Sequence, residues 1–170
     1  MKHIFIINPN AGKSDQTNYI STIVHQLFTN REIEGTYRIE RTISREDTIN
    51  IARKYAQNGE KTILYACGGD GTLNDVLNGC MGYDNITLSH LPIGTGNDFI
   101  KYFGSKAKED FLNLKELMNG NVVDVDVMKV NDHYSLNITN IGLDAMVAYN
   151  VDKFKRIPFI KGKSAYQISI

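Results

Sequence analysis

Short runs of β-forming residues alternate with longer helical segments along the first hundred residues, and this alternation constrains the fold most. The short runs are HIFII at 3–7, TYRIER at 36–41, TILYA at 62–66 and ITLSHL at 86–91. Apolar spacing and capping residues predict helices over about 18–29, 44–58 and 72–78. Strand followed by helix, repeated, is typical of a parallel sheet, so we expect a three-layer α/β domain with helices on both faces.

The pattern changes after a further helical stretch around 110–120. Apolar and polar residues then alternate, as in half-exposed antiparallel strands, in 121–130 (NVVDVDVMKV) and 133–150 (HYSLNITNIGLDAMVAYN). We therefore expect an α/β domain over residues 1–125 and the first strands of a β-rich domain over 126–170. The second domain is expected to be incomplete, because the chain stops soon after it begins.

Three loops rich in Gly, Asn and Asp each follow an apolar run directly: NPNAGK at 8–13, CGGDGT at 67–72 and PIGTGND at 92–98. In a parallel sheet the carboxyl ends of the strands meet at one edge, where such proteins bind ligands. Glycine in a single loop can serve turn geometry alone. Three such loops at one edge favour a shared anionic ligand, held by backbone N–H groups and a helix N-terminus.

Two familiar phosphate-binding signatures do not fit these loops. AGKS at 11–14 resembles the end of a Walker A loop, but the glycine required five residues before Gly12 is Ile7. The Rossmann fingerprint GxGxxG fails as well, because Asn74 and Phe99 stand where the third glycine belongs. The loops therefore belong to neither of these groups.

Asp70 is the unusual member of the central loop, because a bare carboxylate beside phosphates repels them. A divalent cation that bridges the two, directly or through water, would remove this conflict. The alternative is that Asp70 only caps the helix that follows, where Thr72 is also a natural N-cap or hydroxyl donor. From spacing alone, both interpretations of Asp70 stay open.

Composition excludes several classes of protein. Lysine plus arginine and aspartate plus glutamate number 19 each, so no excess of positive charge indicates a nucleic-acid partner. No apolar run approaches the roughly 18 residues of a membrane span. Basic residues cluster at 153–163 (KFKRIPFIKGK), a run suited to a solvated surface or to anionic lipid head groups. Cys67 and Cys80 are expected to be reduced thiols, because the chain has no CxxC pair and no export signal.

The three loop motifs together are more specific than any one of them alone. GGDGTLNDV, with NPNAGK upstream and PIGTGNDF downstream, resembles in order and spacing the diacylglycerol kinase catalytic family, which includes bacterial lipid kinases, sphingosine kinases and ceramide kinases. GGDGT alone is shared with NAD kinases and loosely with phosphofructokinases, so the resemblance implies an NAD kinase/phosphofructokinase-like domain. PIGTGNDF favours the lipid kinases, since an NAD kinase is expected to carry an NxGxLGFL-like segment there.

The resemblance implies a set of ATP contacts, position by position. They are Asn8, Pro9, Asn10, Ala11 and Gly12 in the first loop, Thr42 after the second strand, Gly68, Gly69, Asp70, Gly71, Thr72, Leu73 and Asn74 in the central loop, and Thr95 in the third. Asp70 and Asp98 are implied in a water-mediated Mg²⁺ network, with Asp70 in a supporting catalytic role. Lys13 could neutralise phosphate charge or simply face solvent.

Two features depart from the family pattern. Asp75 stands where the family usually has Glu, which keeps the charge but shortens its reach by one methylene. The DGE-like motif and the general base that act on the lipid hydroxyl in the family resemble nothing in these 170 residues. We therefore expect this chain to supply the nucleotide-binding half of the enzyme and to have little or no turnover by itself.

The resemblance implies an ATP-dependent, Mg²⁺-dependent lipid kinase that transfers the γ-phosphate of ATP to the hydroxyl of a lipid such as diacylglycerol, in phospholipid biosynthesis. Such an enzyme would be cytoplasmic, with peripheral contact at the inner membrane surface, and unpaired strand edges would allow a homo-oligomer. The alternatives are a non-catalytic nucleotide-binding or regulatory module and an NAD kinase-like enzyme.

Overall fold

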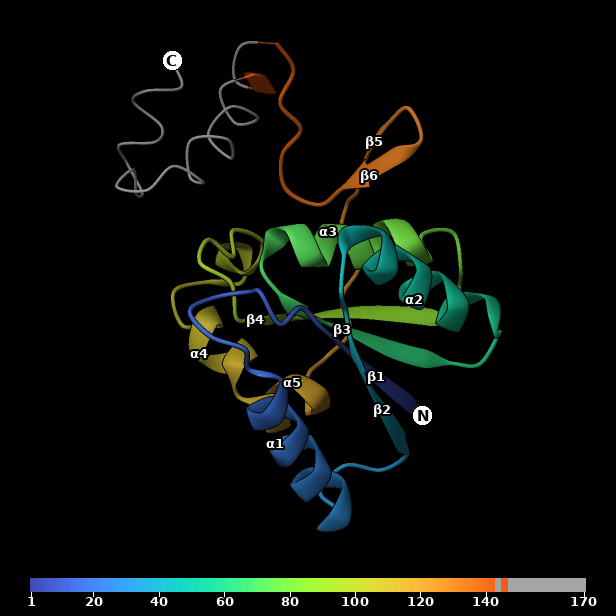
Figure 1. Ribbon diagram of the computed structural model, residues 1–170, viewed down its shortest axis with the longest axis vertical. Coiled ribbons are helices and arrows are strands. Elements are labelled where there is room, and N and C mark those ends of the chain that lie inside the picture. The colour runs from blue at the N-terminus through green and yellow to red at the C-terminus, as the bar shows by residue number, and fades with distance from the viewer. Residues whose placement is uncertain (143–144, 147–170) are drawn as a thin grey trace. The chain divides into compact units, whose positions relative to one another are not determined.

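The computed structural model describes residues 1–142 together with residues 145 and 146 (Figure 1). The chain divides into two compact units, Met1–Asn137 and Ile138–Ile170, and the helices and strands labelled in Figure 1 belong to the first. The basic cluster at 153–163 lies outside the described residues. The expectation of a β-rich domain beginning at residue 126 stays a prediction.

The central strand follows directly from the apolar run at the N-terminus. β1 (Lys2–Ile7) is buried from His3 to Ile7, as expected of a strand covered on both faces. It pairs in parallel with β2 (Thr36–Arg41) and β3 (Thr62–Gly68), and β3 pairs with β4 (Ile86–Pro92). The strand order is β2-β1-β3-β4, which confirms the parallel sheet predicted from the alternation.

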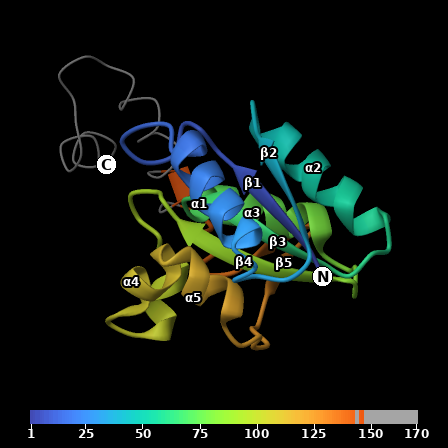
Figure 2. The same ribbon diagram turned by 90° about the horizontal axis from the view of Figure 1, so that it is seen from below.

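Alternate residues of the inner strands build two separate cores. Phe5 and Tyr65 point to one face, where they pack against α1 (Thr17–Thr29) and α5 (Leu114–Asn119). Ile4 and Leu64 point to the other face, against the helices α2 (Arg45–Gln57) and α3 (Asp70–Cys80). Figure 1 shows these helix layers on opposite faces of the sheet, and Figure 2, seen from below, shows α1 and α5 in front of the strands. The predicted three-layer architecture is thus confirmed.

One of the two predicted N-cap residues is confirmed and the other is not. Ser44 is the N-cap of α2, and its hydroxyl accepts a hydrogen bond from the Asp47 amide at 3.1 Å, as expected. α3 begins at Asp70 rather than near Thr72, and its N-cap is Gly69, which has no side chain to contribute. The expectation of Thr72 as an N-cap is therefore wrong, because Thr72 already lies inside the first turn.

Between β4 and residue 120 the chain forms three short helices instead of one helical stretch. They are η1 (Phe99–Phe103), α4 (Ala107–Leu112) and α5. α5 packs on the same face of the sheet as α1, whereas Phe99 of η1 packs against the core on the opposite face. Asn113 separates α4 from α5 because it leaves the helical conformation and its side chain caps Glu116. An Asn in an apolar spacing pattern is a plausible helix residue, so spacing alone did not predict this break.

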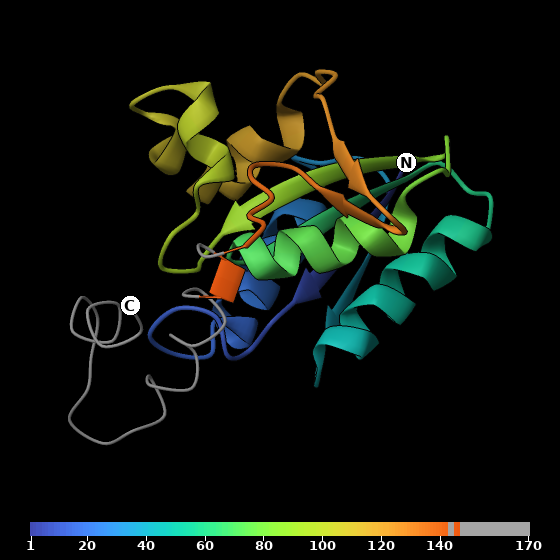
Figure 3. The ribbon, with the colours of Figure 1, turned by 90° about the horizontal axis from the view of Figure 1, so that it is seen from above.

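The expected antiparallel strands exist but are shorter than predicted. β5 (Met128–Val130) pairs antiparallel with β6 (His133–Ser135), and Figure 3 shows this orange hairpin beside α3. Residues 121–127 form no strand, because no other described strand supplies backbone partners for them. Part of the run expected to extend to residue 150 lies outside the described residues.

Two further observations concern the described residues as a whole. Within them, no helix combines the length and the apolar character that a membrane crossing requires. Cys67 and Cys80 are buried free thiols, and burial raises the pKa of both, to about 12 for Cys80. Neither thiol is therefore poised to act as a nucleophile near neutral pH.

Candidate functional site

The carboxyl ends of all four parallel strands open into one cavity. Its volume is about 420 Å³, and the loops after β1, β2, β3 and β4 all contribute to its wall. The lining residues are Asn8, Asn10, Ala11, Gly12, Thr42, Ile43, Ser44, Arg45, Thr48, Gly69, Gly71, Thr72, Asp75, Gly94 and Thr95. The three Gly-rich loops that the sequence singled out therefore meet at one edge of the sheet, as expected.

Asn8 holds the first loop against α3. Its side-chain Nδ2 donates to Thr72 Oγ1 at 3.0 Å, and its Oδ1 accepts from the Asn10 amide at 3.0 Å. Thr42 is tied to the same strand end, because both its amide and its hydroxyl donate to the Ile7 carbonyl. These bonds fix the loops relative to one another, so the cavity wall is preorganised.

Close backbone contacts explain two of the glycines. A Cβ on Gly94 would lie 2.4 Å from the Gly69 Cα, so the central and third loops can touch only without side chains. A Cβ on Gly12 would lie 2.4 Å from the Ile93 carbonyl oxygen, and Gly12 also has φ of +75°. At these positions glycine is needed to bring the loops together.

Gly71 serves a different purpose. It lines the cavity in the first turn of α3, and a Cβ added to it would meet nothing within 4 Å. A larger side chain there would project into free space at the cavity wall. Glycine at this position therefore leaves room for a ligand to approach the backbone.

Two helix N-termini favour negative charge in the cavity. Ser44 and Arg45 from the start of α2 line it, as do Gly71 and Thr72 from the first turn of α3. The first amides of a helix lack intrahelical acceptors and carry the positive end of the helix dipole. The first intrahelical bond of α3 is donated by Leu73 to the Gly69 carbonyl, which leaves the amides before it available. This arrangement suits a phosphate-bearing ligand.

Asp70 contributes to the third loop rather than to the cavity wall. Its Oδ1 accepts hydrogen bonds from the amides of Asp98 at 2.7 Å and Phe99 at 3.2 Å, so it ties the third loop to α3. The Asp98 carboxylate forms an ion pair with Lys101. Within the described residues, no three His, Cys, Asp or Glu side chains cluster as metal ligands. A cation here would need ligands from the bound molecule or from water.

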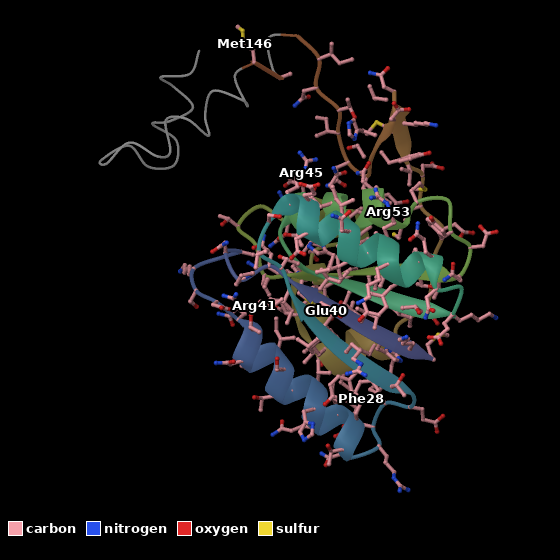
Figure 4. All side chains as sticks on the ribbon, turned by 45° about the vertical axis from the view of Figure 1, so that its right-hand side comes forward. Phe28, Glu40, Arg41, Arg45, Arg53 and Met146 are labelled. Atoms are coloured by element: carbon pink, nitrogen blue, oxygen red, sulfur yellow. The ribbon has the colours of Figure 1, made fainter. Side chains whose placement is uncertain are left out.

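Arg45 and Asp75 form a charged pair in the cavity wall that motif spacing did not predict. Arg45 Nε donates to Asp75 Oδ1 at 2.7 Å, while the side chain of Asp75 is 12% exposed and that of Arg45 is 69% exposed. Burial raises the pKa of the Asp75 carboxyl, and the Arg45 guanidinium opposes this shift. Figure 4 labels Arg45 at the start of α2 and Arg41 at the end of β2.

Asn97 and His90 support the loops from inside the protein and were also missed. Asn97 is buried with φ of +54°, and its Nδ2 donates to the carbonyls of Pro92 and Gly94. His90 Nε2 lies 3.1 Å from the Gly68 carbonyl. The only sequence signal for Asn97 was its residue type and place, an Asn between Gly96 and Asp98, because Asn adopts positive φ more readily than most residues.

The structure separates the expected contacts into two groups. Those that line the cavity are Asn8, Asn10, Ala11, Gly12, Thr42, Gly69, Gly71, Thr72 and Thr95. Those that do not line it are Pro9, Gly68, Asp70, Leu73, Asn74 and Asp98. Leu73 is 2% exposed and belongs to the core between α3 and the sheet. Contacts with ATP or Mg²⁺ stay predictions for all of these residues.

The fold and the loops define a parallel-sheet α/β protein with a phosphate-type site at the carboxyl edge, and comparison with known proteins gives its family. Residues 2–130 match the Diacylglycerol kinase catalytic domain, so the chain belongs to this family. It is 30% identical over 165 residues to a Bacillus subtilis (strain 168) protein named diacylglycerol kinase, an alignment covering 96% of this chain and 52% of the relative. The chain thus spans about half the length of the curated relatives it matches.

Solved structures agree with this assignment. A crystal structure described as that of diacylglycerol kinases from Bacillus anthracis str. Sterne is 28% identical, with a TM-score of 0.58 over 78% of this chain and 48% of that chain. A second structure from the same organism gives a TM-score of 0.64 at 28% identity, covering 90% of this chain and 55% of its own. The α/β fold described above is therefore that of the family.

Proposed function

We propose that this chain binds ATP as part of a lipid kinase that transfers the γ-phosphate to a lipid hydroxyl. The observation that carries the proposal is the single cavity into which four loops and two helix N-termini converge. Phosphoryl transfer depends mainly on positioning and on stabilising negative charge. Backbone amides at a preorganised helix N-terminus supply both.

The residues of the cavity fit a nucleoside triphosphate. Gly69, Gly71 and Thr72 would hold phosphate oxygens, because their backbone belongs to the N-cap and first turn of α3. Thr95 from the third loop lies in the same wall. The remaining wall, from Thr42 to Arg45, is left for the nucleoside. Bound ATP would supply the reactive phosphoryl group, and these residues would orient it.

Mg²⁺ fits the site only as a partner of the phosphates. Mg²⁺ in kinases is commonly held by one or two carboxylates together with phosphate oxygens and water. Asp70 is the half-buried carboxylate that we propose for this role. Its Oδ1 accepts hydrogen bonds from backbone amides, and its Oδ2 lies close to Gly96. We propose that Asp70 contacts the cation through water.

The acceptor is proposed from the family. The relative from Bacillus subtilis is named diacylglycerol kinase, and we propose a lipid alcohol of this kind for the enzyme to which this chain belongs. Its hydroxyl lies at a membrane surface, so we also propose peripheral contact with the membrane on the cytoplasmic side. NAD as the acceptor is the alternative that needs to be tested.

Calorimetric titration with ATP, in the presence and absence of Mg²⁺, tests the nucleotide site. We expect saturable binding by the 170-residue chain and its loss in Gly71→Val, because the valine would project into the cavity. Gln57→Val is the matched control, since Gln57 is exposed at the end of α2 and lies outside this cavity. Equal binding by wild type and Gly71→Val would place the nucleotide elsewhere and refute the proposed site.

Phosphate transfer is measured separately with diacylglycerol and NAD as acceptors. Transfer to NAD but not to diacylglycerol would refute the lipid kinase proposal while leaving ATP binding intact. Kinases typically turn over at about 1–100 s⁻¹. Transfer to diacylglycerol by this chain at such rates would show that its residues also activate the acceptor, whereas binding without transfer limits their role to holding the nucleotide.

A further inference from the structure

β2 is an edge strand, and within the described residues no strand pairs with its outer side, which is therefore an open edge. Proteins usually protect such an edge with proline, lysine, a bulge or a covering segment, because its free backbone groups can pair with another chain. The run TYRIER contains neither proline nor lysine, and its register with β1 is unbroken over all six residues. The open edge of β2 is therefore suited to pairing with another strand.

The hydrogen bonds to β1 show which backbone groups face the open edge. The amides of Thr36 and Thr42 donate toward β1, at 3.2 and 2.9 Å. Successive residues of a strand direct their backbone groups to opposite sides, so the even-numbered residues of β2 bond to β1. Tyr37, Ile39 and Arg41 therefore direct their amide and carbonyl groups outward, where no described strand receives them.

The surface on the outer side of β2 is hollowed rather than filled. Two hollows, each of about 630 Å³, adjoin the strand, one lined by Arg38 and Glu40 and the other by Tyr37 and Arg38. Figure 4 shows the strand running between α1 and α2, with Glu40 labelled on it. A second strand can therefore approach the open edge without displacing either helix.

The charges of β2 select one antiparallel register with an identical strand. Only outward-facing residues can form hydrogen-bonded pairs, so odd-numbered residues must lie opposite odd-numbered ones. Centring the pair on Ile39 places Arg38 opposite Glu40 of the second copy, and Glu40 opposite its Arg38. Moving the centre to Arg38 or to Glu40 would set two like charges directly opposite each other, which is unfavourable.

Both charged side chains are available for this contact. Arg38 is exposed, and it forms no ion pair within the part of the chain that the structure describes. Glu40 Oε1 accepts a hydrogen bond from the Tyr55 hydroxyl, which holds the carboxylate in place and leaves Oε2 for the guanidinium of the second copy. The same register sets Tyr37 opposite Arg41 of the second copy, a pair suited to a cation–π contact.

We propose that two copies of this chain associate by antiparallel pairing of their β2 strands, which joins two parallel sheets into one. The same surface is used on both copies, so the Arg38–Glu40 pair occurs twice. Strand pairing alone buries little surface, and we therefore expect a dissociation constant in the micromolar range. None of the residues from Tyr37 to Arg41 lines the cavity proposed for the nucleotide, so this proposal does not depend on ATP binding.

Sedimentation velocity at increasing concentration measures the association, and amide hydrogen exchange identifies the edge. The amides of Tyr37, Ile39 and Arg41 should exchange rapidly in dilute protein and become protected as the dimer forms. Those of Arg38 and Glu40 should be protected throughout, because they bond to β1. Absence of a dimer, or a dimer that leaves exchange of the three outward amides unchanged, would overturn the proposal.

Charge reversal tests the register. Arg38→Glu and Glu40→Arg each replace both attractive contacts by repulsive ones, so each variant alone should dimerise about tenfold more weakly or worse. An equimolar mixture of the two variants should form a heterodimer, because their charges are complementary to each other. Arg53→Glu is the matched control, since Arg53 is exposed on α2, and it should dimerise as wild type does.

Two results of the charge reversal would contradict the proposal. Single variants that dimerise like wild type would place the interface elsewhere, and variants that stay apart on mixing would exclude the Arg38–Glu40 register. Urea unfolding shows whether each variant is folded, and hydrogen exchange of wild type tests the edge even if Glu40→Arg unfolds on losing its Tyr55 contact. ATP titration of the same samples reports the nucleotide site separately, so failure of the two proposals can be told apart.

Discussion

At the scale of single residues, Gly12 and Gly59 allow backbone strain to be separated from a steric clash. Both have positive φ, +75° and +74°, but only a Cβ on Gly12 would strike a neighbour, the Ile93 carbonyl oxygen. We expect Gly59→Ala to lower the free energy of unfolding by about 1–2 kcal/mol through strain alone. Gly12→Ala should lower it by about 1–3 kcal/mol more, because the loops must move apart.

Urea unfolding measures both changes, and ATP titration adds a second contrast. Gly12→Ala should weaken ATP binding because Gly12 lines the cavity proposed to bind the nucleotide, whereas Gly59→Ala should leave it unchanged. Equal destabilisation by the two substitutions would show that the loop after β1 yields without cost and that its close approach to the third loop is not required.

The Asp75 carboxyl is predicted to reduce stability at neutral pH. Burial raises its pKa in the folded protein, so the folded state holds the proton more tightly than the unfolded chain, whose Asp pKa is about 3.9. The stabilisation by this proton is full below that value and is lost as pH rises through the folded pKa. Asp75→Asn should therefore unfold at equal or higher urea concentration than wild type at pH 7, and the difference should shrink below about pH 4.

The same substitution should harm ligand binding. Asp75 lines the proposed nucleotide cavity, and its Oδ1 accepts a hydrogen bond from Arg45 Nε at 2.7 Å, so its loss frees the guanidinium from its position in the wall. If Asp75→Asn is more stable than wild type but binds ATP more weakly, Asp75 contributes to ligand binding at the expense of stability. Lower stability of Asp75→Asn at pH 7 would contradict the predicted pH dependence and show that the ion pair outweighs burial.

At the scale of elements, Asn78 joins α3 to the β5–β6 hairpin. Its Nδ2 donates to the Tyr134 carbonyl and its Oδ1 accepts from the Tyr134 amide, both at 2.9 Å, so the side chain pairs with Tyr134 as a strand would. Asn78→Ala should lower the free energy of unfolding by about 1 kcal/mol, because two partly buried backbone groups of Tyr134 lose their partners. Faster hydrogen exchange of the Tyr134 amide is the more specific readout.

Asn119→Ala is the matched control for this element. Asn119 makes the same kind of bond within its own helix, from Nδ2 to the Lys115 carbonyl at 2.9 Å, but contacts no hairpin through it. It should leave the Tyr134 amide protected. Unchanged exchange of that amide in Asn78→Ala would mean that the hairpin stays in place by packing alone.

Helices and strands were predictable where neighbouring residues in the sequence determine them. The run TYRIER predicted β2 with its observed bounds, Thr36–Arg41, because strand residues and turn residues adjoin without ambiguity there. The alternation of apolar and polar residues in 121–127 predicted a strand that does not form. Such alternation shows which side chains would face a core, but not whether a neighbouring strand is present to pair with the backbone. Asn113 interrupts a helical pattern through its own capping bond, which spacing does not reveal.

The residues of the candidate site also fall into those that local sequence predicts and those that it does not. Its loops were predictable because Gly, Asn and Asp directly after a buried strand have a local meaning in a parallel sheet. Arg45 and Asp75 were not, because they are 30 positions apart and meet only when α2 packs on α3. His90 likewise acquires its role from the Gly68 carbonyl, 22 positions away. Long-range pairs of this kind depend on the fold and leave no periodic signal in one sequence.

At the scale of the whole molecule, the proposed nucleotide cavity is lined by the loops after all four described parallel strands, so its ligand should stabilise the unit Met1–Asn137 as a whole. The wall combines loops from the first strand to the fourth, and these loops adjoin only when the sheet is complete. A ligand that binds only the folded state adds about 2.7 kcal/mol to the free energy of unfolding at one hundred times its Kd. ATP with Mg²⁺ should therefore raise the urea midpoint of the wild-type chain by a matching amount.

Gly71→Val and Gln57→Val make this prediction decisive. Gly71→Val should unfold close to the wild-type midpoint without ligand, because a Cβ at this position would meet no neighbouring atom within 4 Å, but it should gain nothing from ATP. Gln57→Val should gain as much as wild type, since its position is remote from the cavity wall. If ATP raises the midpoint of Gly71→Val as well, the nucleotide binds the folded chain at some other place, and convergence of the four loops serves only to close the sheet edge.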